Sequence, residues 1–200
     1  MRLILATLAT LALAACATTR EASLPQQWQQ QATDNDRQRL RDWRTAFAKA
    51  LVQAKATNSA EVAAEGRLLD PDAAIGGVPI PNGEYRCRTI KVGAKQEGLL
   101  NYIAYPAFRC RIGAGAVQQF TKLTGSQRPV GIIYPADALR QVFLGTLVLG
   151  DETEAYQYGR DRDRDMAAWV ERIDDKRWRM VFPYPHYEST LDIIELVPVG

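Results

Sequence analysis

Two short segments of the chain each carry a cysteine between two arginines, a combination that can do redox, metal or anion chemistry. The segments are residues 85–90, centred on Cys87, and residues 108–112, centred on Cys110. Paired cysteines form a disulfide or help to hold a metal ion. Arginine guanidinium groups bind carboxylates and phosphates through two parallel hydrogen bonds. The spacing of these residues decides which chemistry is available.

Both segments have the two-residue period of a β-strand, in which alternate side chains share one face. The two cysteines share one face with apolar neighbours, and the other face carries Arg86, Arg88, Arg109 and Arg111. A polar run at residues 95–98 ends in glycine near the midpoint, so an antiparallel hairpin that turns there places Cys87 opposite Cys110. There is no Cys-x-x-Cys pair and a single histidine, His186. We therefore predict a structural Cys87–Cys110 disulfide rather than a metal or redox site.

The four arginines need anions, because like charges on one face of a sheet repel one another. Carboxylates of neighbouring strands are the simpler source, and the candidates are Glu84, Glu188, Asp192 and Glu195. A bound phosphate, carboxylate or anionic lipid headgroup is the alternative, since guanidinium groups suit such ligands. Ion-pair networks are common in folded proteins. We favour the carboxylates and keep an anion-binding site at the four arginines as a hypothesis.

The only histidine lies close in the sequence to two groups that could take part in hydrolysis. His186 is followed by Glu188 and Ser189, within a proline-rich turn. No Gly-x-Ser-x-Gly elbow surrounds a serine, and the sequence cannot show the geometry that a catalytic triad needs. We assign no catalytic residue on this basis.

Three aspartates alternate in a charged run, like the start of a calcium-binding EF-hand loop; they are Asp161, Asp163 and Asp165. The pattern then fails, because Met166 replaces the required glycine and Arg172 stands where the last glutamate ligand should be. Interleaved arginines also neutralise the acids. We expect a solvated, self-paired loop, with no metal ligand and no cofactor.

The N-terminus has the pattern of a bacterial lipoprotein signal. Arg2 supplies a positive charge, residues 3–11 are apolar, and small residues lead to Cys16. We expect cleavage before Cys16 and lipidation of its thiol, so that the protein is anchored in the bacterial cell envelope at the periplasmic face of the outer membrane. An ordinary secretory signal is the alternative. Either compartment is oxidising, which favours the predicted disulfide.

The chain divides into a leader, a tether and a folded part. Residues 1–15 form the signal peptide, and residues 16–32, rich in glutamine, are expected to be a flexible tether. A helical segment at residues 33–69 and a β-domain at residues 83–199 are expected to fold as one unit, 33–199. The formal charge of +2 lacks the basic excess of nucleic-acid binders. The expected partners are therefore the membrane, through Cys16, and a small anionic molecule or an envelope protein.

The first part of the folded region has a helical period. Residues 33–56 carry one apolar stripe at spacings of three and four, made of Leu40, Trp43, Phe47, Leu51 and Ala54. Thr33 is a suitable N-cap. A short second helix is predicted at residues 58–65, where Asn58 and Glu61 fit a capping box and Gly66 fits a stop. The stripe is interpreted as core packing rather than a ligand site.

From residue 84 onward the pattern is that of short strands. Besides the two cysteine segments, apolar or alternating runs occur at residues 118–123, 130–134, 142–149, 168–173, 178–182 and 191–197. About eight antiparallel strands favour a closed barrel or a sandwich, because closure removes exposed edges. We predict an α+β fold with the N-terminal helix packed on a small lipocalin-like barrel.

Several of these segments together resemble an uncharacterised proteobacterial family catalogued as domain of unknown function 4893. The resemblance covers roughly residues 35–198 and rests on residues 85–91, 108–112, 122–128, 142–145 and 171–173. The paired Arg-Cys-Arg segments are its most specific part. The resemblance implies a secreted or lipid-anchored envelope protein. The family has no known activity, so no catalytic residue can be transferred.

These observations favour a non-catalytic envelope lipoprotein whose β-domain binds a small anionic ligand or a protein partner. The alternatives are an envelope hydrolase that uses carboxylates or His186, and an inhibitor of a periplasmic protease or lysozyme. An open, polar pocket in the barrel would favour the ligand or enzyme hypotheses. A filled barrel would favour interaction through the surface.

Overall fold

The computed structural model describes residues 27–77, 79–115 and 117–199. The predicted signal peptide, Cys16 and the first part of the predicted tether lie outside the described residues. The helices are α1 (Gln27–Gln31), α2 (Asp34–Arg41), α3 (Trp43–Ala64) and a 3-10 turn, η2 (Gly66–Leu69). The strands are β1 (Gly83–Ala94), β2 (Tyr102–Ala104), β3 (Phe108–Gly113), β4 (Gln118–Lys122), β5 (Gln127–Pro135), β6 (Arg140–Leu149), β7 (Asp165–Asp174), β8 (Arg177–Pro183) and β9 (Ser189–Pro198).

The strands form one antiparallel sheet that closes on itself. Each of β3 to β8 pairs with the next strand, and β1 closes the barrel by pairing with β9 on one side and with β3 on the other. The short β2 lies on the same side of β1 as β3 and pairs with residues 90–92, near the C-terminal end of β1. The prediction of an α+β fold with an eight-stranded barrel is confirmed, with β2 as one extra strand. Closure leaves no long free edge, which removes the main route to edge-to-edge aggregation.

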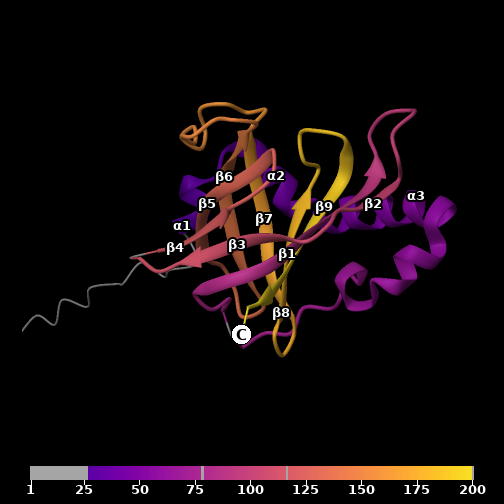
Figure 1. Cartoon of the computed structure of the whole chain (residues 1–200), viewed down its shortest axis with the longest axis horizontal. Coiled ribbons are helices and arrows are strands. Elements are labelled where there is room, and N and C mark those ends of the chain that lie inside the picture. Colours follow the sequence, from indigo (N-terminus) through magenta and orange to yellow (C-terminus); the bar gives the residue numbers. More distant parts are fainter. Residues whose placement is uncertain (1–26, 78, 116, 200) are drawn as a thin grey trace, which may run out of the picture.

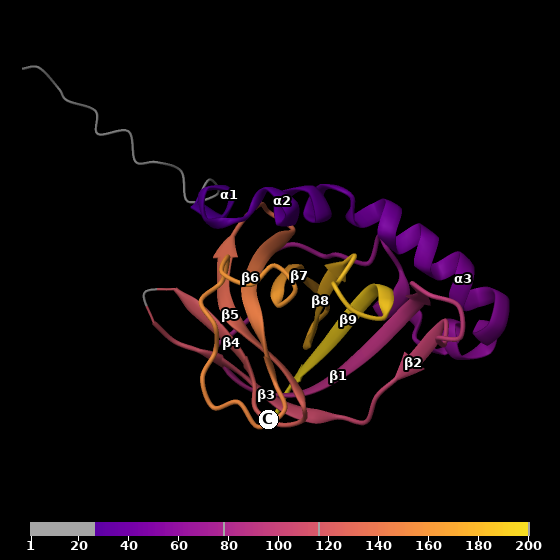
Figure 2. The ribbon, with the colours of Figure 1, turned by 90° about the horizontal axis from the view of Figure 1, so that it is seen from above.

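The helices lie in a single layer along one side of the barrel (Figure 2). The β6–β7 and β8–β9 loops meet at one end of the barrel, which we call the open end, and the C-terminus lies at the other (Figure 1). Aromatic and aliphatic side chains fill the barrel toward the C-terminal end. They include Tyr85, Ile112, Phe120, Ile133, Phe143, Val170, Trp178 and Leu196.

A glycine pair allows one of these rings to lie flat against the barrel wall. Gly131 of β5 faces Gly145 of β6, and the Phe143 ring covers both. A Cβ at Gly131 would lie 2.3 Å from the carbonyl oxygen of Leu144, and a Cβ at Gly145 would lie 2.5 Å from the Phe143 ring. Any side chain at either position would displace the ring from the core.

The helical segment differs from the prediction in its breaks. The expected single helix at residues 33–56 is two helices, because the chain leaves helical geometry at Asp42. The expected second helix at residues 58–65 is instead the end of α3, which is kinked at Asn58. Thr33 caps α2 as predicted, accepting a hydrogen bond from the Asp36 amide at 3.2 Å. Gly66, with φ of +53°, ends α3.

The apolar stripe of the helices packs on the outer face of the barrel. Phe47, Ala50 and Ala54 of α3 are fully buried and contact outward-facing residues of β1, β8 and β9. The interpretation of this stripe as core is therefore supported by the contacts. Residues 27–31, expected to be part of a flexible tether, instead form α1, where Trp28 is buried and packs edge-on against Trp169 at 5.8 Å.

The disulfide is present, but the predicted register is wrong by two residues. Cys87 faces Phe108 and Cys110 faces Tyr85, so the two cysteines are diagonal neighbours with Cα atoms 6.1 Å apart. A shift of two residues keeps every side chain on its predicted face. Both cysteines therefore still point into the barrel and are fully buried.

Candidate functional site

The barrel is not filled at its open end, where a cavity of about 320 Å³ lies between the strands. Inward-facing positions change there from apolar to polar along the same strands. On β1 the inward series runs from Tyr85 through Thr89 to Lys91, and on β4 Phe120 is followed by Lys122. The floor of the cavity stays apolar, with Phe108, Leu147, Met166, Phe182 and Ile194. We call this space the mouth cavity.

Lys122 is the one cation of the mouth cavity that has no carboxylate partner among the described residues. Its ammonium lies 4.2 Å from the centre of the Phe108 ring, a cation–π contact. Burial lowers the pKa of Lys122, and the positive charges of Lys91 and Arg128 lower it further. An anion that entered the cavity beside Lys122 would favour the charged ammonium and so oppose these effects.

A second wall of the cavity carries two carboxylates around one lysine. The Lys91 ammonium lies 3.0 Å from Glu188 and 3.4 Å from Asp192, and the Ser189 hydroxyl donates to Asp192. Burial disfavours the charged form of Lys91, but Asp192 and Glu188 outweigh it and raise the pKa of this lysine. Burial raises the pKa of Asp192 against the opposing effects of Lys91 and Ser189. We call Lys91, Glu188 and Asp192 the carboxylate wall.

The β8–β9 loop holds this wall in an unusual backbone conformation. Tyr184 and Glu188 have positive φ angles, of 47° and 63°, which residues other than glycine rarely adopt. The Lys95 ammonium donates to the carbonyls of Pro185 and His186, and the Lys95 amide donates to the Glu188 carbonyl at 2.9 Å. These bonds fix the loop against the end of β1.

A small side pocket of about 40 Å³ opens next to the carboxylate wall. Asp165 is 4% exposed, and one of its carboxylate oxygens has no hydrogen-bond partner in the described part of the chain. Burial raises the pKa of Asp165, which favours the protonated acid. The pocket has room for about one water molecule or a single small group. The run that contains Asp161, Asp163 and Asp165 was expected to be a solvated loop. Its last aspartate is instead buried, because Asp165 begins β7 and packs beneath α2.

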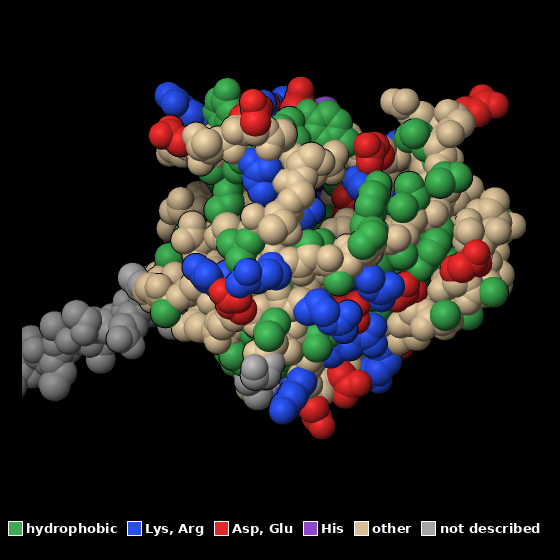
Figure 3. All heavy atoms as spheres, viewed as in Figure 1, with side chains coloured by type: hydrophobic (Ala, Val, Ile, Leu, Met, Phe, Trp, Pro, Cys, Tyr) green, Lys and Arg blue, Asp and Glu red, His purple; other side chains and the backbone are tan. Residues whose placement is uncertain are grey.

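The four arginines of the two cysteine segments lie on the outer face of the barrel, away from the mouth cavity. Arg109 and Arg111 share Glu84, at 2.6 and 2.8 Å, while Arg88 bonds to Glu65 and Glu195. Arg86 is exposed and faces Arg109. Basic and acidic side chains accordingly alternate over this face in Figure 3.

This arrangement supplies the carboxylates that the sequence analysis favoured. Glu84 and Glu195 were two of the four expected partners, whereas Glu188 and Asp192 pair with Lys91 instead. Glu65 was missed as a partner because it comes from the end of α3. Anion binding at the arginine face stays a prediction.

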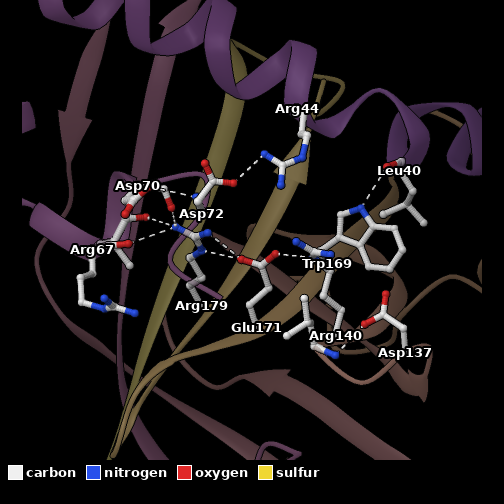
Figure 4. Close-up of polar contacts among 12 residues, drawn as sticks. Leu40, Arg44, Arg67, Asp70, Asp72, Asp137, Arg140, Trp169, Glu171 and Arg179 are labelled. Carbon is white, nitrogen blue, oxygen red and sulfur yellow. Dashed lines mark hydrogen bonds and ion pairs between the residues drawn. The ribbon is translucent and has the colours of Figure 1, made fainter. Parts of the chain in front are cut away.

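A buried ion pair forms a separate network between the barrel and the helical segment (Figure 4). Arg179 and Glu171, both with 0% exposed side chains, form an ion pair at 2.7 Å. Glu171 also accepts from Arg140 at 2.6 Å. Arg179 donates to backbone carbonyls of the η2 segment. Nη2 of Arg179 makes only the ion-pair contact with Glu171 and no hydrogen bond. The other contacts join η2 to the barrel.

The hydrolase candidates are not assembled into a catalytic group. Ser189 is buried and bonded to Asp192, while His186 is exposed and lies 3.4 Å from Asp163. No hydrogen bond joins His186 to Ser189 within the described residues. The same part of the chain contains no cluster of three histidine, cysteine, aspartate or glutamate residues that could hold a metal ion.

Sequence reasoning missed Lys122 as a site residue. The alternation of Phe120 and Lys122 in a predicted strand was the available signal, because a barrel interior rarely takes an unpaired lysine. The depth of that position along the barrel cannot be deduced from a two-residue period.

In the described residues, no helix has both the length and the apolar character needed to cross a membrane. No curated protein and no solved structure matches the chain. Residues 28–196 match the sequence profile of a family described as a domain of unknown function, DUF4893. This match takes in α2, α3 and all nine strands except the last two residues of β9. The chain therefore belongs to the DUF4893 family.

Proposed function

We propose that the protein is a non-catalytic binding protein of the bacterial cell envelope that takes a small anionic ligand into the mouth cavity. The observation that carries this proposal is Lys122, a half-buried ammonium that forms no ion pair with a described carboxylate and lies on the apolar floor of the cavity beside Phe108. Removing a charge from water costs free energy unless a counter-charge replaces the lost hydration. A ligand anion would supply that counter-charge.

The surroundings of Lys122 suit such a ligand. The hydroxyls of Thr124 and Ser126 lie on the rim beside it and can add hydrogen bonds to an anionic group. The aromatic and aliphatic floor can take an apolar segment of the ligand. The cavity volume of about 320 Å³ admits a molecule of metabolite size rather than a folded partner.

The proposed place of action is the periplasmic face of the outer membrane, with Cys16 as the lipid anchor. The apolar run and small residues that precede Cys16 support this part of the proposal. The buried Cys87–Cys110 disulfide also fits an oxidising compartment. A Cys16→Ser variant should leave the membrane fraction or stay uncleaved. Unchanged fractionation and migration on a gel would contradict the anchor.

The test of ligand binding uses alkanoates as probes and isothermal titration calorimetry as the measurement. Octanoate should bind the parent protein, and Lys122→Gln should weaken binding about tenfold or more, as expected for the loss of one charge-assisted hydrogen bond. The control is Lys55→Gln, an exposed lysine on α3. If both variants bind octanoate as the parent does, Lys122 is not the anion site.

The hydrolase alternative has weaker support, because Ser189 is buried against Asp192 and His186 points to Asp163. An envelope inhibitor stays open as an alternative, but no described pocket or contact specifies its target.

A further inference from the structure

The mouth cavity has opposite charges on two separated walls. Lys122 comes from β4, while the carboxylate wall comes from β1, β9 and the β8–β9 loop. In the closed barrel, β1 and β3 stand between β9 and β4, so the two walls come from different strands around the same cavity. The cavity is therefore electrically dipolar.

The carboxylate wall has more acceptors than its own lysine can use. Two carboxylates share the single Lys91 ammonium. The Glu188 side chain is 47% exposed, and its contact with Lys91 uses only one of its two oxygens. The other oxygen remains available to a hydrogen-bond donor in the cavity. Lys91 itself is 8% exposed and turned toward the carboxylates, so it offers little to an arriving anion.

The position of Glu188 is held at a cost in backbone energy. A non-glycine residue at a φ of 63° lies in a sparsely populated and strained region of backbone conformation. Hydrogen bonds maintain this conformation. The Lys95 ammonium donates to carbonyls of the loop, and the Tyr184 backbone amide donates to the Thr190 carbonyl. Strain of this kind is frequent at ligand sites, where it orients a functional side chain.

We infer that the ligand of the mouth cavity is zwitterionic, with an anionic group at Lys122 and an amine at the carboxylate wall, joined by a short apolar chain. The inference rests on the proposed function and narrows its ligand class. A simple fatty acid would place its methyl end beside Glu188 and Asp192. The two carboxylates would then lose contact with water without gaining a hydrogen bond. A dianion would be repelled by the same carboxylates. An ω-amino acid satisfies both walls.

The test compares ligands that differ only in the amine. The full-length protein in detergent is titrated with ω-aminohexanoate and hexanoate, then with ω-aminooctanoate and octanoate. One pair should show the amino compound binding about tenfold to a hundredfold more tightly, the range for a hydrogen bond between charged groups. Glu188→Gln should reduce that ratio, and Lys122→Gln should weaken both members of the pair. Glu97→Gln, on the exposed β1–β2 loop, is the control and should keep the ratio.

Each other outcome has a distinct meaning. If alkanoates bind through Lys122 but the amine adds nothing at either length, the zwitterion inference is overturned while the proposed function stands. If no probe binds the parent, both are overturned. If the advantage of the amine persists in both Glu188→Gln and Asp192→Asn, the amine contacts another part of the protein and the assignment to the carboxylate wall is wrong.

Discussion

Replacing Glu171 by glutamine should be among the most destabilising conservative changes in this protein. Glu171 is the common acceptor of Arg179 and Arg140, and its side chain has no exposed surface. Glutamine keeps the size of the side chain but removes the charge. Arg179, also fully buried, would then retain its positive charge, because a guanidinium group does not lose its proton in proteins.

The size of the effect follows from burial. Breaking a buried ion pair by removing one partner costs about 3–5 kcal/mol, because the remaining charge is uncompensated. The carbonyls of Arg67, Leu68 and Asp70 still accept from Arg179, which favours the lower half of that range. For a domain of this size, each kcal/mol lowers the melting temperature by about 2–4 °C. We therefore expect Glu171→Gln to melt about 6–16 °C below the parent.

Circular dichroism during heating and urea titration measures the change. The control is Asp175→Asn, which removes the partner of Arg172 on a hairpin where the aspartate is 94% exposed, and which should change stability by less than about 1 kcal/mol. A double variant, Glu171→Leu with Arg179→Met, should be more stable than Glu171→Gln, because it leaves less charge buried. A loss below about 1 kcal/mol in Glu171→Gln would refute the reasoning and assign the stabilisation of Arg179 to the carbonyls alone.

Three further outcomes are expected. Reduction of the Cys87–Cys110 disulfide, whose cysteines are 23 residues apart, should cost about 3 kcal/mol by loop entropy and lower the melting temperature, and free thiols in the unreduced, denatured protein would contradict it. If Glu84 satisfies the outer arginines, sulfate should stabilise the parent and Arg109→Gln equally, whereas a smaller gain in the variant would restore the anion site. Hexanoate affinity should be greatest between the carboxyl pKa of the probe and the lowered pKa of free Lys122, and should be lost as pH rises through the higher pKa of the complex; a titration series without this loss would exclude Lys122 as the anchor.

The face of each strand could be predicted from the sequence, but its register could not. Alternation along residues 85–90 and 108–112 fixes which side chains point inward, and Cys87 and Cys110 do so. The register depends on where the chain turns. The polar run at 95–98, which ends in glycine, indicated one turn, whereas the chain also adds β2 before it reaches β3. The two-residue error that results leaves the faces unchanged, which is why the disulfide prediction survived it.

The sequence also could not show which strand residues are covered by helices that lie far away in the chain. Arg179 alternates with buried neighbours and has the pattern of a solvent-facing residue, yet α3 and η2 cover it completely. The same period places Lys122 inside the barrel but does not say whether its level is filled. Both properties depend on contacts between segments far apart in the sequence, and no local period encodes them.

The interior of the barrel is apolar at the C-terminal end and lined by charged and polar side chains at the open end. The C-terminal part is filled by close-packed rings such as Phe120 and Phe143, at 5.7 Å, which stabilise the fold. At the open end, Lys91 and Asp192 are buried as an ion pair. Apolar residues of similar volume at such positions are often equally stable or more so. Core stability therefore gives no reason for the unpaired ammonium of Lys122, and a ligand anion, as proposed above, would give one.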